Sequence, residues 1–367
     1  MSEKEIIWDL TELFTNHDDP EISKTINTLL ETADEIVNQY NGKVNLPNFT
    51  ARDLHDLLKK YEEILANIGD LEIFSLTSYY ANMNLPNIKT LYNKYMDFQS
   101  SMSKKLAFLE LDTGKLVIDK PQIMNEEILS NYRKHLEKIR RIFPYKLSET
   151  EEKIILEKDQ YGVKAWAQLI NSWISTRKFK VIVEGKEKII SIGEFFPLAQ
   201  HPDRETRISI YKSVCGVLGN EEEIYSSALR NICGDWVKTT KLRDYDSPIH
   251  QSLIDNDTTQ EIIDNLMNTV KNNIHIYQKF LKIKTKLLNL PKLHGVDIFA
   301  YLPSKKKYTW DETKQITYQI YNNFEKSFGE IVSDIFDRSH VDASTREGKR
   351  AGGWCPPWYN GKTAFIL

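Results

Sequence analysis

The sequence has little of what marks secreted, membrane-spanning or nucleic-acid-binding proteins. Its 367 residues include three cysteines and no CxxC pair, so it lacks a disulfide framework and fits a reducing compartment. It has no run of about 18 apolar residues without a charge, which excludes a membrane-spanning helix. Its net charge of −3 provides no concentrated positive face for nucleic acids or acidic membranes. We therefore expect a cytoplasmic protein whose partners are neither nucleic acids nor membranes.

The histidines and cysteines are too scattered to form a recognisable catalytic motif. No two of the eight histidines stand three or four residues apart, and the HExxH pattern is absent. Asp337, His340 and Asp342 come nearest to a metal-binding group, but a polar loop after a helix is the preferred interpretation. Cys355 has no histidine near it in sequence, which favours a packed thiol over a nucleophile. We predict no catalytic residue and no metal ligand within residues 1–367.

The sequence does have a strong helical period. In the segment 258–288, apolar residues recur at steps of three and four from Ile262 to Leu281, which predicts a long amphipathic helix. Capping boxes, in which a hydroxyl and a carboxylate satisfy free amides of the first turn, are indicated at Thr258-x-x-Glu261, Ser148-x-x-Glu151 and Thr309-x-x-Glu312. Further helices are expected near 21–41, 50–68, 88–112, 123–140, 160–175, 204–240 and 311–336.

One segment reads as a β-hairpin. In FKVIVEGKEKIIS, apolar residues alternate with polar ones on both sides of Glu184-Gly185, which predicts a hairpin near 178–191. A polar, proline-containing break follows at 198–207. The chain also exceeds the roughly 250–300 residues at which a single core stops growing. We therefore expect a helical lobe with the hairpin at 1–197 and a second lobe at 198–367.

The segment REGKRAGGW contains residues that suit peptide binding. Gly352 and Gly353 allow another backbone to come close, as an edge strand that receives a peptide requires. Arg346, Lys349 and Arg350 either pair with carboxylates or face solvent on a turn. On the residues alone, a basic turn is the preferred interpretation.

Five segments, taken together and in order, resemble oligoendopeptidase F of the thimet oligopeptidase family of zinc metallopeptidases. They are WDLTELF from Trp8, SYYANMNLPNIKTLYNKYMDF from Ser78, HPDRETRISIYKSV from His201, KLRDYDSPIHQSL from Lys241 with the later VDIFAYL, and VDASTREGKRAGGWC from Val341. The resemblance implies a mainly α, multi-helical, two-lobed oligopeptidase with a small β-hairpin and a C-terminal β segment. It also implies hydrolysis of short, unstructured peptides within a channel.

In that family, zinc is held by an HExxH helix that follows the glycine-rich segment, together with a glutamate from a later helix. None of these ligands lies within residues 1–367. The resemblance therefore implies that this stretch is the N-terminal part of such an enzyme, binds no zinc by itself and is inactive alone. It also implies that Gly352, Gly353 and Trp354 lie near the strand that lines the channel, with the three cations Arg346, Lys349 and Arg350 on the turn before it. The alternative, that these residues only fix the turn, stays open.

Two functions follow from this reading. In the first, a C-terminal polypeptide carrying the zinc motif covers apolar surface around Trp354, Trp358 and residues 365–367, and the combination hydrolyses peptides. In the second, the chain is a non-catalytic helical protein that binds peptides or a partner through the same groove.

Overall fold

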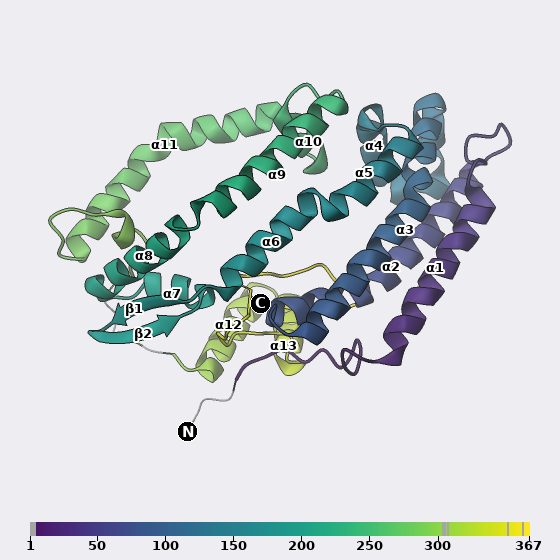
Figure 1. Ribbon diagram of the computed structural model, residues 1–367. Coiled ribbons are helices and arrows are strands. Elements are labelled where there is room, and N and C mark those ends of the chain that lie inside the picture. Colours follow the sequence, from purple (N-terminus) through teal and green to yellow (C-terminus); the bar gives the residue numbers. More distant parts are fainter. Residues whose placement is uncertain (1–4, 303–305, 307, 351, 362) are drawn as a thin grey trace.

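Helices dominate the computed structural model, which describes residues 5–302, 306, 308–350, 352–361 and 363–367 (Figure 1). The α-helices are α1 Pro20–Tyr40, α2 Ala51–Ala81, α3 Pro86–Asp119, α4 Arg133–Ile142, α5 Glu149–Tyr161, α6 Val163–Thr176, α7 Phe195–Ala199, α8 Arg204–Gly219, α9 Glu222–Leu242, α10 Pro248–Asp255, α11 Gln260–Leu287, α12 Trp310–Phe324 and α13 Lys326–Asp337. Short 3₁₀ helices are η1 Pro121–Asn125, η2 Glu127–Tyr132, η3 Phe143–Tyr145, η4 Ile192–Glu194 and η5 Gly295–Asp297. The prediction of a mainly α fold is confirmed.

Several predicted helices have different limits in the structure. The segment 204–240 is two helices, interrupted at Asn220 and Glu221, where α8 ends on Gly219, a poor helix former. The segment 311–336 is also two helices, because Glu325 adopts an extended conformation and α13 folds back onto α12. Helix α11 is capped by Thr259, one residue later than predicted, whereas the boxes at Ser148 and Thr309 are confirmed.

The largest core lies in the first part of the chain, where α1, α2, α3 and α4 pack together. Helix α2 runs to Ala81, well beyond its predicted end near 68, because Leu71, Ile73 and Phe74 are buried against neighbouring elements. A capping box between Thr50 and Asp53 fixes its start. Figure 1 shows these helices at one end of the molecule, with α8 and α11 toward the other.

The predicted hairpin is confirmed. Strands β1 Phe179–Val183 and β2 Lys186–Ile190 pair antiparallel, and both turn residues, Glu184 and Gly185, have positive φ as a tight hairpin turn requires. Phe179, Val181 and Ile190 are buried against Ile210 and Val214 of α8. The hairpin core thus crosses the expected boundary at 198, and the division into 1–197 and 198–367 stays a prediction.

Helix α11 is amphipathic as predicted, but its apolar stripe is not buried. Seven side chains of the stripe are each about half exposed: Ile262, Leu266, Met267, Val270, Ile274, Tyr277 and Phe280. Helices α12 and α13 also expose large apolar side chains, among them Ile320, Phe324 and Phe328. The described part of the chain therefore leaves these helix faces uncovered.

The two ends of the described chain meet. Trp8 and Ile73 form a small buried cluster with Phe365, and the Trp8 and Phe365 rings meet edge to face with centroids 6.2 Å apart. Ala343 and Ser344 each donate a backbone hydrogen bond to the carbonyl of Ile6, at 3.0 and 3.1 Å. Figure 1 shows the C-terminus near the middle of the molecule. The last segment is therefore anchored on the N-terminal part of the protein.

Candidate functional site

The segment 340–367 brings three short stretches of backbone side by side. Val341 and Ile366 form an isolated parallel β-bridge, in which the Asp342 amide donates to Ile366 at 2.9 Å and the Ile366 amide donates to His340 at 2.8 Å. Leu367 then pairs with Trp354, since each backbone amide donates to the other residue's carbonyl, at 2.8 and 3.4 Å. The C-terminal β segment expected from the resemblance is thus a set of bridges around Trp354.

The glycine-rich turn docks on the end of α2. The Met83 amide donates to the carbonyl of Gly348 at 2.7 Å, and the Arg350 amide donates to the carbonyl of Tyr80 at 2.9 Å. Gly348 has φ +80°, and a Cβ atom built on it would lie 2.4 Å from Oδ1 of Asn82. Only glycine fits here, because both the backbone conformation and the close approach exclude a side chain.

A buried carboxylate holds two of the three predicted cations. Asp342 has no exposed surface and forms ion pairs with Arg346 and with the Lys349 ammonium, the latter at 2.8 Å. Lys349 also donates to the carbonyls of Asp342 and Ser344, at 2.7 and 3.1 Å. Burial lowers the pKa of Lys349, and the nearby Arg346 acts in the same direction, whereas Asp342 opposes both. The residues Asp342, Arg346 and Lys349 are called the Asp342 cluster below.

The third cation has a different environment. The Arg350 guanidinium lies over the Tyr80 ring, 4.3 Å from its centroid, and Trp354 meets the same ring edge to face at 4.8 Å. Within the described residues, the Arg350 side chain has no carboxylate partner and no hydrogen bond. Arg350 is therefore held by an aromatic surface that leaves its N–H donors unused.

A cavity of about 330 Å³ opens beside this segment. The predicted site residues Arg346, Lys349, Arg350 and Gly352 contribute to its lining, together with backbone and side chains of 341–343, Thr345, 366–367 and Gly193. Trp354 lies next to the cavity through its pairing with Leu367. Gly353 is exposed, and a Cβ on it would lie 3.6 Å from the Leu367 carbonyl oxygen. The structure therefore places four of the six predicted site residues on the lining of one hollow, whereas Gly353 and Trp354 are not part of that lining.

The polar loop at Asp337, His340 and Asp342 does not converge on a common point. His340 is buried and hydrogen-bonds Glu12 through Nε2, while its Nδ1 lies 3.1 Å from the Thr363 hydroxyl. Asp342 belongs to the Asp342 cluster, and Asp337 accepts a hydrogen bond from Ser333. No three histidine, cysteine, aspartate or glutamate side chains converge as metal ligands in the part of the chain that the structure describes. The described residues therefore do not fit the zinc that the family resemblance implies.

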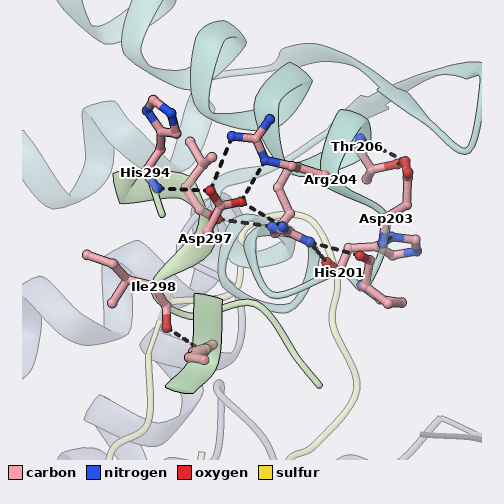
Figure 2. Close-up of polar contacts among 11 residues, drawn as sticks. His201, Asp203, Arg204, Thr206, His294, Asp297 and Ile298 are labelled. Carbon is pink, nitrogen blue, oxygen red and sulfur yellow. Dashed lines mark hydrogen bonds and ion pairs between the residues drawn. The ribbon is translucent and has the colours of Figure 1, made fainter. Parts of the chain in front are cut away.

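A second polar centre joins the segment HPDRETR to the segment VDIFAYL through Asp297. The sequence alone did not predict this contact. Figure 2 shows the Asp297 carboxylate between the His294 backbone and Arg204. Asp297 accepts hydrogen bonds from Arg204 at 3.0 and 3.2 Å, from Arg207 at 2.8 Å and from the His294 amide at 3.0 Å. Arg207 is itself only 1% exposed and donates to the carbonyls of Val296, His201 and Pro202.

Burial alone raises the pKa of Asp297, but the hydrogen bonds from Arg204, Arg207 and His294 outweigh it and lower the pKa to about 2. The carboxylate is thus fully charged and fully occupied. Since the Asp297 carboxylate and the buried Arg207 guanidinium find their partners within the group, its arrangement suits a structural tie between α8 and the loop 295–301. Tyr301 adds to this tie through its amide, which donates to the Gln200 carbonyl at 2.9 Å.

None of the helices in the described residues has the length and apolar character to cross a membrane. The three cysteines are free and exposed, so the expectation that Cys355 is a packed thiol is wrong.

Comparison with known proteins identifies the family. The profile of oligopeptidase F matches residues 121–179, and that of peptidase family M3 matches residues 197–367, together more than half of the chain. The chain is 22% identical to oligopeptidase PepF of Bacillus subtilis over 367 residues, which covers 98% of this chain and 54% of PepF. It is also 22% identical to group B oligopeptidase PepB of Streptococcus agalactiae, covering 100% of this chain and 60% of PepB.

Solved structures agree with this at the level of the fold. Oligoendopeptidase F from Enterococcus faecium has a TM-score of 0.68 at 17% identity, covering 86% of this chain and 65% of that one. A putative oligoendopeptidase F from Bacillus anthracis has a TM-score of 0.71 at 16% identity, covering 100% of this chain and 62% of that one. The chain thus spans less than two thirds of the length of these relatives. It belongs to peptidase family M3, within the oligoendopeptidase F group.

Proposed function

We propose that residues 1–367 form the substrate-binding part of an oligoendopeptidase that hydrolyses short, unstructured peptides. The observation that carries this proposal is the hollow beside the glycine-rich turn, which lies within the stretch that matches peptidase family M3. The names of the relatives, which describe oligopeptidases, support the same substrate class. The three exposed thiols support a reducing, cytoplasmic location.

Peptide binding by strand addition is supported by the backbone of Gly352 and Gly353. Both glycines are exposed, and neither makes a hydrogen bond through its backbone within the described residues. The exposed N–H and C=O groups of Gly353, next to the hydrogen-bonded pair Trp354–Leu367, are free to receive an extended peptide, whereas Gly352 has φ +86° and turns the chain just before it. Main-chain pairing of this kind accepts many sequences, which suits an enzyme for short peptides.

We further propose that catalysis requires a segment with the HExxH motif, which residues 1–367 lack. In metallopeptidases that motif holds zinc, and the metal supplies an activated water and polarises the scissile carbonyl. Residues 1–367 contribute binding and orientation of the peptide backbone. By themselves they are expected to hydrolyse nothing and to hold no stoichiometric zinc.

The uncovered faces of α11, α12 and α13 support docking of such a segment. Large contiguous apolar surfaces on soluble proteins mark interaction sites. Leu266 and Phe280 of α11 are 55% and 50% exposed, and Phe324 of α12 is 78% exposed. We propose that a polypeptide carrying the zinc motif covers these faces. The surface expected around Trp354, Trp358 and residues 365–367 is a poorer candidate, because Phe365 is fully buried and its neighbours pack on it. The same surfaces favour the second candidate function, in which the chain binds a partner without catalysis.

A complementation assay tests the proposal. Residues 1–367 are incubated with a fluorogenic peptide and zinc, alone and with the part of Bacillus subtilis PepF that the chain does not match. The expected result is no hydrolysis by either part alone and zinc-dependent hydrolysis by the mixture. Hydrolysis by residues 1–367 alone, or one tightly held zinc per chain by elemental analysis, contradicts the proposal that residues 1–367 bind the peptide and a second segment supplies the zinc site. A mixture that binds but does not hydrolyse favours the partner-binding alternative.

A further inference from the structure

The cavity beside the glycine-rich turn carries a charge that its own residues do not balance. Its lining includes one carboxylate, Asp342, and three cations, Arg346, Lys349 and Arg350. Asp342 forms ion pairs with Arg346 and Lys349, but its single negative charge balances only one of these two positive charges. Each of the four side chains is buried or partly buried, so water screens the remaining positive charge less than at an open surface. A hollow of this kind attracts an anion.

The donors available to that anion belong mainly to Arg350. Lys349 has no donor left for the anion, because its three N–H groups already donate to the Asp342 carboxylate, the Asp342 carbonyl and the Ser344 carbonyl. Arg346 faces the same carboxylate through both terminal nitrogens. Arg350, stacked over Tyr80, keeps its planar fork of five donors without a partner in the described residues.

The shape of the donor indicates the chemistry of the ligand. An arginine fork matches a carboxylate through two parallel hydrogen bonds, and stacking on an aromatic ring holds the fork in place before binding. The nearest acidic residue in sequence, Glu347, pairs with Lys178 at 2.7 Å and does not line the cavity. The unpaired backbone of Gly352 lies on the same lining. A peptide that pairs with this backbone thus passes close to Arg350.

We propose that this cavity binds a carboxylate of the peptide substrate, with Arg350 as its principal ligand. The inference rests on the proposed peptide-binding function and adds a substrate class to it: peptides that present a carboxylate near the glycine-rich turn. The carboxylate comes either from the C-terminus of the peptide or from an aspartate or glutamate side chain. Arg350 is a specificity residue in this proposal, and the Asp342 cluster positions it by fixing the turn.

Four peptides of equal length test the proposal by isothermal titration calorimetry on residues 1–367. The first is acetylated tetra-alanine with a free C-terminus, and the second is its C-terminal amide. The third and fourth are amides with an internal glutamate or an internal glutamine. At least one of the two anionic peptides is expected to bind about tenfold more tightly than its neutral counterpart, the size of one charge-assisted bidentate contact. Preference for the free acid assigns the C-terminus, and preference for glutamate assigns a side chain.

Matched variants separate Arg350 from general charge. In R350Q the preference for the anionic peptide is expected to disappear, and in R350K it is expected to be reduced, because lysine lacks the fork. K178Q is the control, because it removes a neighbouring cation that lies outside the cavity lining. It is expected to keep the full preference. Thermal melting of each variant verifies folding.

The outcomes distinguish this inference from the function on which it rests. Equal affinity for all four peptides overturns the carboxylate site and leaves peptide binding intact. A preference that survives in R350Q overturns the role of Arg350. Failure to bind any of the four peptides at millimolar concentration overturns both the proposed function and the carboxylate site.

Discussion

Replacing Asp297 by asparagine removes the charge from the most completely occupied carboxylate in the described chain. Asp297 has no exposed surface, and it faces Arg207, which is 1% exposed. The asparagine side chain has nearly the same size, so packing is kept while Arg207 becomes a buried cation without a counter-ion. Breaking a buried pair by removing one partner costs about 3–5 kcal/mol. Arg207 retains its bonds to three backbone carbonyls, so we expect a loss near the lower end, about 3 kcal/mol in the free energy of unfolding.

Arg204 provides a matched control for this experiment. It donates to the same carboxylate, but its side chain is 34% exposed, so R204Q is expected to cost much less stability than D297N. Urea unfolding monitored by circular dichroism gives the two losses. Hydrogen exchange is expected to show weaker protection at the start of α8 and in the loop 295–301 of D297N. Equal losses below about 1 kcal/mol in both variants would refute the argument that Arg207 and Asp297 act as a buried pair.

The same carboxylate predicts a pH dependence. Its pKa is depressed in the folded state, from an ordinary value of 3.8 to about 2. Its contribution to stability is therefore present above about pH 4 and is lost as the pH falls toward 2. The wild-type protein is expected to lose about 2 kcal/mol more than D297N over that window. Identical acid profiles for the two proteins would contradict the assignment.

Three further substitutions test the docked segment and the uncovered helix. G348A is expected to cost about 2 kcal/mol, because Gly348 has φ +80° and a Cβ there would lie 2.4 Å from Asn82; an unchanged melting temperature would show that the turn can move away. F365A is expected to lower the free energy of unfolding by about 3 kcal/mol, because Phe365 is fully buried. A decrease of less than about 1 kcal/mol would mean that the segment is not packed as described. The double variant L266E/F280E is expected to keep its melting temperature, since both side chains are about half exposed on α11. It is also expected to bind less of a hydrophobic dye. A melting temperature several degrees lower would show that this face is packed.

The sequence by itself determined those features that depend on short stretches of chain. The hairpin follows from apolar alternation around Glu184-Gly185, both of which take positive φ. The capping boxes at Ser148 and Thr309 follow from two side chains three residues apart. The helical period of α11 is equally local. The order of five short motifs was enough to indicate the family.

The tertiary structure decided what those local features contact. Helix α2 extends to Ala81 because Leu71 and Phe74 find buried neighbours, which a helix-end signal does not encode. The apolar stripe of α11 reads as a core face in the sequence, yet the described chain leaves it exposed. For the cations, the sequence left pairing and solvation open. Folding brought Asp342 onto Arg346 and Lys349, seven residues away at most, but placed Arg350 over Tyr80, 270 residues earlier in the chain. Charge balance at a site depends on distances between remote segments, and only the folded chain sets those distances.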